Sequence, residues 1–195
     1  ILTLYQNKYF LSSSNKENLS FVLAIIKKFK IRKKTLINVI KNFKGLKYRQ
    51  QVIFDNRNIS IINDSKSTSY SSSVSILKSL LNVYWIVGGL PKKGDKFLLS
   101  KKYCKTFKAY IFGKNKNFFT KELKKKMRYK NFTNLSYLLK NVLLDIKKEK
   151  NAKHKTILFS PAAASFDSFK NFEDRGEKFN KLIQTLKFKK IIYAK

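Results

Sequence analysis

The stretch Val83-Tyr-Trp-Ile-Val-Gly-Gly89 is a continuous apolar run that ends in two glycines, and it decides the fold class. Two similar runs follow along the chain, one at residues 107–112 before Gly113 and one at residues 156–160 before Pro161. Strands that are apolar on both faces belong to parallel sheets, which helices cover on both sides. The runs therefore predict an α/β fold with a mostly parallel sheet and helices on both of its faces.

Segments with helical periodicity separate these strands, as a parallel sheet requires. Ligands of such sheets bind at the carboxyl ends of the strands. The pattern predicts helices at residues 72–81, 120–126, 134–148 and 169–186, a closing strand at 191–193, and a hairpin of strands 51–55 and 59–62 around Asn56-Arg57-Asn58.

The beginning of the sequence has a different pattern, with fewer strands and two consecutive helices. A strand and two helices do not make a domain, so we expect this part to be the end of a domain. The predicted features are a strand fragment within residues 1–11 (1–5 and 9–11), a helix at 17–30 with Asn15 as its N-cap, a helix at 33–43, and Gly45 as the C-cap.

The net charge of +33 comes from 44 Lys and Arg residues against 11 Asp and Glu residues. Such a charge is typical of proteins that bind the nucleic-acid backbone. However, 39 of the basic residues are lysines, and Lys, Asn, Ile, Phe and Tyr, which have AT-rich codons, together make up 101 of the 195 residues. Recognition of phosphates and bases favours arginine, so codon bias accounts for part of the charge. A basic nucleic-acid-binding α/β module remains an alternative.

The remaining composition excludes several classes of protein. A hydrophobic content of 43% with 17 Phe excludes a disordered basic tail. No run of 18 apolar residues is present, so we expect no transmembrane segment. The single cysteine, Cys104, cannot form an internal disulfide, which fits the cytoplasm. His154 has no partner pattern, and no zinc-like spacing of ligands occurs.

Polar residues gather after three of the predicted strands, where a ligand would bind. The turn Asn63-Asp-Ser-Lys-Ser-Thr-Ser69 offers a carboxylate, a cation and hydroxyls, which suit a ribose, phosphate or carboxylate. Residues 88–95 form a glycine-rich loop that is not a Walker loop, because Asp95 stands in place of the required lysine. Each of these two segments could instead be a plain surface turn. Residues 160–176 are the most specific segment, with small residues and a hydroxyl that suit a carboxylate near a helix start.

Together these motifs resemble the Mur ligases of peptidoglycan synthesis, in the family's order and over essentially the whole chain. Four segments carry the resemblance. Ser160-Pro-Ala-Ala-Ala-Ser-Phe-Asp-Ser-Phe-Lys-Asn-Phe-Glu-Asp-Arg-Gly176 is similar to the signature of the D-glutamate-adding group of the family. Asn63-Asp-Ser-Lys-Ser-Thr68 is similar to an Asn-Asp-Ser-Lys-Ala-Thr turn, Gly45-Leu-Lys-Tyr-Arg49 to a Gly-Leu-x-His-Arg segment with Tyr48 replacing His, and Asn15-x-x-Asn18 to a His-Asn-x-x-Asn helix start with Ser14 replacing His.

The resemblance implies an enzyme of three domains. Residues 1–44 would be the end of the central ATP-binding domain, and residues 45–195 the Rossmann-like C-terminal domain. The P-loop, the Mg²⁺ ligands and the modified lysine of the central domain are not in this sequence. We therefore expect a fragment that does not catalyse alone.

The implied reaction is the ATP-dependent joining of D-glutamate to UDP-N-acetylmuramoyl-L-alanine through an acyl phosphate. The resemblance further implies Mg²⁺ as cofactor, a cytoplasmic monomer and no specific nucleic acid as partner. Another Mur ligase or a folylpolyglutamate-type ligase is the alternative within the superfamily. The implied roles are Lys66 as the catalytic residue, Asn15, Asn18, Arg49 and Asp64 on the nucleotide, and Lys66, Thr68, Lys92 or the adjacent Lys93, Ser165 and the backbone of Phe172 on D-glutamate.

Overall fold

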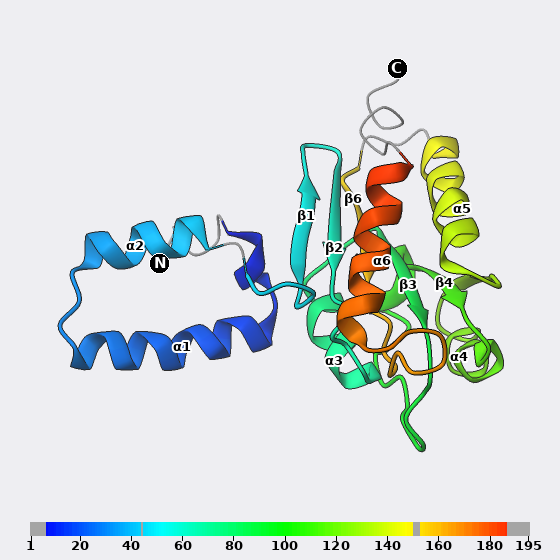
Figure 1. Cartoon of the computed structure of the whole chain (residues 1–195), viewed down its shortest axis with the longest axis horizontal. Coiled ribbons are helices and arrows are strands. Elements are labelled where there is room, and N and C mark those ends of the chain that lie inside the picture. The colour runs from blue at the N-terminus through cyan, green and yellow to red at the C-terminus, as the bar shows by residue number, and fades with distance from the viewer. Residues whose placement is uncertain (1–6, 44, 150–152, 187–195) are drawn as a thin grey trace.

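The computed structural model describes residues 7–43, 45–149 and 153–186 of the chain. A six-stranded sheet forms the centre of these residues (Figure 1). The strand order is β1-β2-β6-β3-β4-β5, in which β1 is antiparallel to β2 and every other neighbouring pair is parallel. The strands are β1 (Gln51–Asp55), β2 (Ile59–Asn63), β3 (Val83–Gly88), β4 (Lys108–Phe112), β5 (Arg128–Asn131) and β6 (Lys155–Phe159).

Helices cover both faces of the sheet, which confirms the predicted α/β architecture. Trp85 and Leu158 point to one face, where they pack with α3 (Tyr70–Leu77) and α4 (Lys116–Leu123). Ile86 and Phe159 point to the other face, where they pack with α5 (Leu135–Lys148) and α6 (Phe172–Thr185). Neighbouring residues of one strand thus enter different cores, as strand geometry requires. The short 3₁₀ helix η3 (Tyr103–Thr106) precedes β4.

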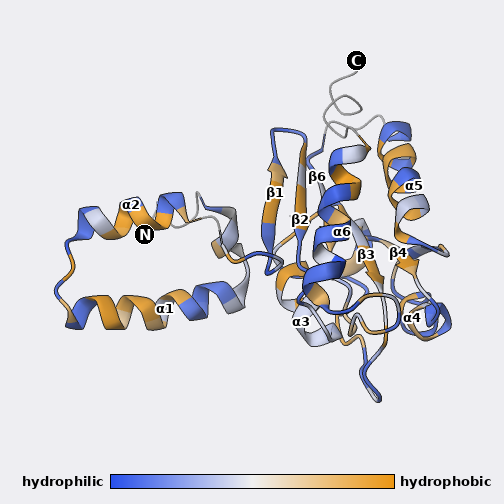
Figure 2. Cartoon of the chain, viewed as in Figure 1, coloured by the Kyte–Doolittle hydropathy of each residue, from blue (hydrophilic) through white to orange (hydrophobic). Residues whose placement is uncertain are grey.

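The first helices project away from the sheet as a separate hairpin (Figure 1). They are the 3₁₀ helix η2 (Lys8–Leu11), α1 (Ser13–Lys28) and α2 (Lys33–Asn42), and they share a small core of Phe10, Leu19 and Ile40. Figure 2 shows apolar residues along both helices, and Phe21 and Phe29 are exposed. This hairpin buries little of its apolar surface against the sheet.

Three predictions for the N-terminal part are wrong. The segment 9–11 lies in η2, so the expected strand is absent there, and residues 1–6 lie outside the described residues. The N-cap of α1 is Ser12, which accepts a hydrogen bond from the Asn15 N–H, so Asn15 lies in the first turn of the helix. Gly45 has the positive φ expected of a C-cap, +75°, but α2 already ends at Asn42 with Phe43 as its cap.

Further differences concern element boundaries. The helix predicted at 120–126 begins four residues earlier as α4, and the helix predicted at 72–81 begins at Tyr70, because Ser69 caps its first turn. The strand β5 was not expected from the sequence, since its four residues, Arg-Tyr-Lys-Asn, are all exposed at the sheet edge. The predicted strand 191–193 lies outside the described residues.

In the described part of the chain, no helix combines the length and the apolar character that crossing a membrane requires.

Candidate functional site

A cleft of about 610 Å³ lies between the start of α1, the segment before β1 and the turn after β2. It brings together residues that are far apart in the sequence. Six of the predicted site residues line this cleft, namely Asn15, Asn18, Arg49, Asp64, Lys66 and Thr68.

Backbone hydrogen bonds hold the turn after β2 in place. The Asp64 N–H donates to the Phe159 carbonyl oxygen (2.7 Å), which ties the turn to the end of β6. The Ser67 N–H donates to the Asp64 carbonyl oxygen (2.9 Å), and the Lys66 N–H donates to the Tyr48 carbonyl oxygen (3.0 Å). The turn is therefore a fixed element that presents Lys66 beside the segment before β1.

The cleft combines cations with hydroxyl donors, which suits an anionic ligand. Arg49 is exposed and Lys66 is partly buried at its wall. Ser71 and Ser72, in the first turn of α3, contribute hydroxyls to the same wall. The arrangement suits a phosphate or a carboxylate, which are the ligands that the sequence favours for the turn after β2.

Asp64 is 6% exposed, and both of its carboxylate oxygens are engaged within the protein. Oδ1 accepts from the Gln50 N–H (3.1 Å) and Oδ2 accepts from the Ser160 hydroxyl (2.7 Å). Burial raises the pKa of Asp64 to about 7, against the hydrogen bonds from Ser160 and Gln50 and the charges of Arg175 and Arg49, which lower it. In this structure Asp64 holds the segment that carries Arg49.

Replacing Asp64 by asparagine should flatten the pH dependence of the free energy of unfolding. The pKa of the folded state lies above its ordinary value of 3.8, so the folded chain binds a proton that the unfolded chain releases. Protonated Asp64 therefore adds to the free energy of unfolding, by at most about 4 kcal/mol. This contribution is complete below about pH 4 and is lost as the pH rises through about 7. Urea unfolding at pH 4 and pH 8 measures the effect. Relative to the parent chain, the asparagine variant should have a more favourable free energy of unfolding at pH 8 than at pH 4. An equal difference at both pH values would contradict this prediction.

Lys92 and Ser165 do not line this cleft and lie on two loops that are joined to each other. Leu90 and Ala164 exchange two backbone hydrogen bonds of 2.9 Å, so the loop of Lys92 runs beside the loop of Ser165. Lys92 is exposed, whereas Ser165 is 3% exposed. These two side chains follow β3 and β6, at the carboxyl edge of the sheet.

Lys66 connects the cleft to the start of α6. Its Nζ lies 3.9 Å from the centre of the Phe172 ring, a cation–π contact. The hydroxyl of Ser65 donates to the Phe172 carbonyl oxygen (2.8 Å), which engages one of the two backbone groups through which Phe172 could act. The lysine thus stands between the cleft and the second group of predicted residues.

Sequence reasoning assigned no role to Ser160 or Arg175, which the structure places in the support of the site. The Ser160 hydroxyl binds Asp64, and Arg175 is fully buried behind Ser65. A signal for Arg175 was present, because it precedes the core residue Phe179 by four positions and therefore lies on the buried face of α6. An arginine on a buried face needs partners.

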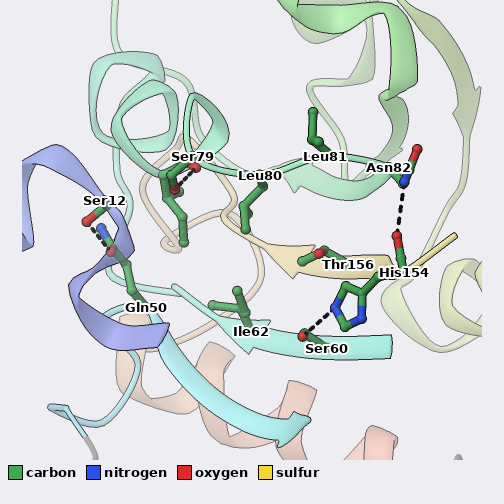
Figure 3. A pocket seen from close by; sticks show the side chains of 11 residues that line it. Ser12, Gln50, Ser60, Ile62, Ser79, Leu80, Leu81, Asn82, His154 and Thr156 are labelled. Carbon is green, nitrogen blue, oxygen red and sulfur yellow. Dashed lines mark hydrogen bonds between the residues drawn. The ribbon is translucent and has the colours of Figure 1, made fainter. Parts of the chain in front are cut away.

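A second pocket, of about 320 Å³, contains none of the predicted site residues (Figure 3). His154 lies at its wall, where its Nε2 is 2.8 Å from the Ser60 hydroxyl and its Nδ1 is 3.0 Å from the Arg57 carbonyl oxygen. Asn82 donates to the His154 carbonyl oxygen (3.0 Å). His154 therefore has structural partners that the sequence pattern did not reveal, and it fastens the start of β6 to β2.

Among the residues that the structure describes, no group of three or more His, Cys, Asp and Glu side chains could hold a metal ion. Cys104 is 1% exposed, and burial raises the pKa of its thiol.

The fold is that of an α/β domain which solved Mur ligases also contain. The UDP-N-acetylmuramate–alanine ligase MurC of Thermotoga maritima matches 90% of this chain with a TM-score of 0.53 and 15% identity, over 39% of its own chain. MurF of Acinetobacter baumannii matches 87% of this chain with a TM-score of 0.59 and 14% identity, over 38% of its own chain. At these identities the likeness concerns the fold. No family model matches the sequence.

The sequence comparison is more specific. The UDP-N-acetylmuramoylalanine–D-glutamate ligase of the Wolbachia of Brugia malayi is 37% identical over 175 residues, which are 90% of this chain and 35% of the relative. The ligase of the same name from Rickettsia felis is 36% identical over 176 residues, which are 90% of this chain and 39% of the relative. The chain is thus related in sequence to the C-terminal part of the D-glutamate-adding Mur ligases, as its motifs predicted, and it spans little more than a third of their length.

Proposed function

We propose that this chain supplies the C-terminal part of an ATP-dependent ligase that joins D-glutamate to UDP-N-acetylmuramoyl-L-alanine in peptidoglycan precursor synthesis. In this proposal residues 1–44 end the central ATP-binding domain and residues 45–195 form the C-terminal domain. The observation that carries it is the position of Lys66, which lines the cation-rich cleft and also contacts Phe172 at the start of α6.

The reaction proceeds in two steps. Transfer of the γ-phosphoryl group of ATP to the alanyl carboxylate forms an acyl phosphate and ADP. The amine of D-glutamate then attacks the acyl carbon, the tetrahedral intermediate expels phosphate, and the amine loses a proton. Both steps move negative charge, so cations that are held in place before the reaction lower the barrier.

In this proposal the residues of this chain have three roles: contact with the nucleotide, stabilisation of charge and binding of D-glutamate. Asn15, Asn18 and Arg49 contact the nucleotide, and Asp64 holds the Arg49 segment. Lys66 stabilises the developing negative charge. D-glutamate is held by two anchoring regions, so that its amine meets the acyl carbon in a reactive orientation. These anchors are Lys66 and Thr68 after β2, and Lys92 or Lys93, Ser165 and Phe172 on the other loops.

Mg²⁺ supplies charge neutralisation at the phosphates of ATP, and the resemblance assigns its ligands to the central domain rather than to these residues. The enzyme acts as a cytoplasmic monomer on small-molecule substrates in this proposal, with no specific nucleic acid as partner.

The test uses an enzyme in which this chain follows the N-terminal part of the Wolbachia relative, up to the start of the matched region; we call it the joined enzyme. It should release phosphate only when ATP, UDP-N-acetylmuramoyl-L-alanine and D-glutamate are all present. The chain alone should release none. A folded joined enzyme without this activity would contradict the proposed function, and turnover by the chain alone would contradict its status as a fragment.

Replacing Ser165 by alanine in the joined enzyme should raise the KM for D-glutamate about tenfold and leave the KM for ATP near its original value. One hydrogen bond to a charged ligand accounts for a change of this size. Lys92→Ala should act in the same direction, and steady-state kinetics with varied D-glutamate measures both. Ser20→Ala, which changes an exposed serine on α1, is the control. An unchanged KM for D-glutamate in Ser165→Ala would exclude the assigned role.

A further inference from the structure

Arg175 is a fully buried arginine in the first turn of α6, directly behind the candidate site. Its Nε donates to the Ser65 hydroxyl (3.1 Å), and its Nη2 donates to the Ser65 carbonyl oxygen (2.7 Å). Ser65 lies between Asp64 and Lys66. Two bonds from one planar group therefore fix the turn that carries Lys66 against α6.

The same guanidinium touches the loop that carries Lys92. A Cβ atom at Gly89 would lie 3.1 Å from the Arg175 Nη1 and 2.5 Å from the Ala164 carbonyl oxygen. Gly89 has a φ of +135°, and its carbonyl oxygen accepts from the Asn115 side chain (3.1 Å). The glycine thus lets the loop after β3 lie against the guanidinium.

The loop of Ser165 is linked to Arg175 through charge. Asp167, two residues after Ser165, attracts the guanidinium. The Asp167 side chain also lies close to Gly113, where a Cβ would be 3.0 Å from the Asp167 Oδ2. Both Asp167 carboxylate oxygens and the Arg175 Nη1 are buried. Burial lowers the pKa of Arg175 to about 10, so the guanidinium is still charged at neutral pH. The Asp167 carboxylate and the Arg175 guanidinium therefore attract each other in a surrounding of low dielectric constant.

We propose that Arg175 is a positioning residue that sets three segments relative to one another: the turn of Lys66, the loop of Lys92 and the loop of Ser165. These are the segments to which the proposed function assigns D-glutamate, and the proposal rests on that function for the identity of the ligand. Arg175 acts through Ser65, Gly89 and Asp167 and makes no contact with substrate.

The test follows the position of Lys66 in the chain itself by NMR. Because Lys66 lies over the Phe172 ring, the ring current should shift its ε-methylene signal upfield, and Phe172→Leu should abolish that shift and so identify the signal. Arg175→Lys keeps the charge but lacks the planar fork. The upfield shift of Lys66 should be lost in Arg175→Lys, and the amide signals of Gly89 and Ser165 should move with it.

Two controls separate positioning from general damage to the fold. Arg128→Lys changes an exposed arginine on β5 and should leave all of these signals unchanged. The methyl signals of Ile86 and Leu158, which report the two cores, should stay in place in every variant. A folded Arg175→Lys chain that keeps the upfield Lys66 signal overturns the proposal. If Arg175→Lys does not fold, Asp167→Asn removes the charge that attracts the guanidinium and should move the amide signals of Gly89 and Ser165; unchanged signals would overturn the proposal.

Kinetics of the joined enzyme distinguish this proposal from the proposed function. Arg175→Lys should raise the KM for D-glutamate by at least fivefold with the KM for ATP within twofold of the parent. Loss of the Lys66 shift with an unchanged KM for D-glutamate would support the positioning role and contradict the assignment of D-glutamate to these segments. A KM effect without any change in the Lys66 signal would overturn the positioning role.

Discussion

Replacing Lys66 by alanine in the joined enzyme should lower kcat/KM about a hundredfold to a thousandfold. The partly buried ammonium group lies between the cleft and Phe172, where it can meet the negative charge that develops on the reacting groups. Removal of one such preorganised group from an active site has an effect of about this size. Initial rates of phosphate release at varied D-glutamate measure it.

Lys78→Ala is the matched control for this prediction. Lys78 is an exposed lysine at the end of α3, whereas Lys66 precedes the start of that helix. Both changes remove one positive charge, so a loss that came from net charge would be the same in each. Lys78→Ala should retain most of the parent activity. A Lys66→Ala enzyme with nearly full activity would remove Lys66 from the proposed mechanism.

Replacing Gly88 by alanine should lower the free energy of unfolding by about 3–5 kcal/mol, an effect typical of severe conflict in a core. Gly88 ends β3 with a φ of +147°, and a Cβ there would lie 2.1 Å from the backbone carbonyl oxygen of Phe112 on β4. That oxygen belongs to a neighbouring strand, so the sheet itself would have to move. Urea unfolding of the chain at neutral pH measures the loss.

Gly94→Ala separates the close contact from the cost of the backbone angle. Gly94 also has a positive φ, +75°, but no heavy atom lies within 4 Å of the position of its Cβ. Its replacement should cost only about 1–2 kcal/mol, the penalty of a left-handed conformation for a residue with a side chain. Equal effects of the two substitutions would show that contact with Phe112 does not determine the role of Gly88.

The central strands were predictable because burial on both faces makes their sequences continuously apolar. In β3 every residue is buried, and its limits differ from the prediction by one residue. The strand β5 was not predictable for the converse reason. It pairs with β4 alone at the edge of the sheet, its side chains are exposed, and its backbone pairing leaves no apolar pattern in the sequence.

The segments that come together at the site were more predictable from the sequence than the contacts that each residue makes there. Parallel strands end at one edge of a sheet, so the polar turns after β2, β3 and β6 had to come near one another. The hydrogen bond from Ser160 to Asp64 spans 96 positions, however, and follows only from the adjacency of β2 and β6. The same applies to Arg175, whose bonds to Ser65 depend on how α6 packs on the sheet.

The measurement that tests the central claim most directly is the mass of the product that the joined enzyme forms from a mixture of amino acids. With ATP and UDP-N-acetylmuramoyl-L-alanine, the mixture contains D-glutamate, L-glutamate, L-alanine and D-alanyl-D-alanine in equal amounts. The glutamate adduct should be the main product, and it should disappear when D-glutamate alone is omitted. A product that contains another amino acid, or an adduct that persists without D-glutamate, would contradict the assignment of this chain to a D-glutamate-adding ligase.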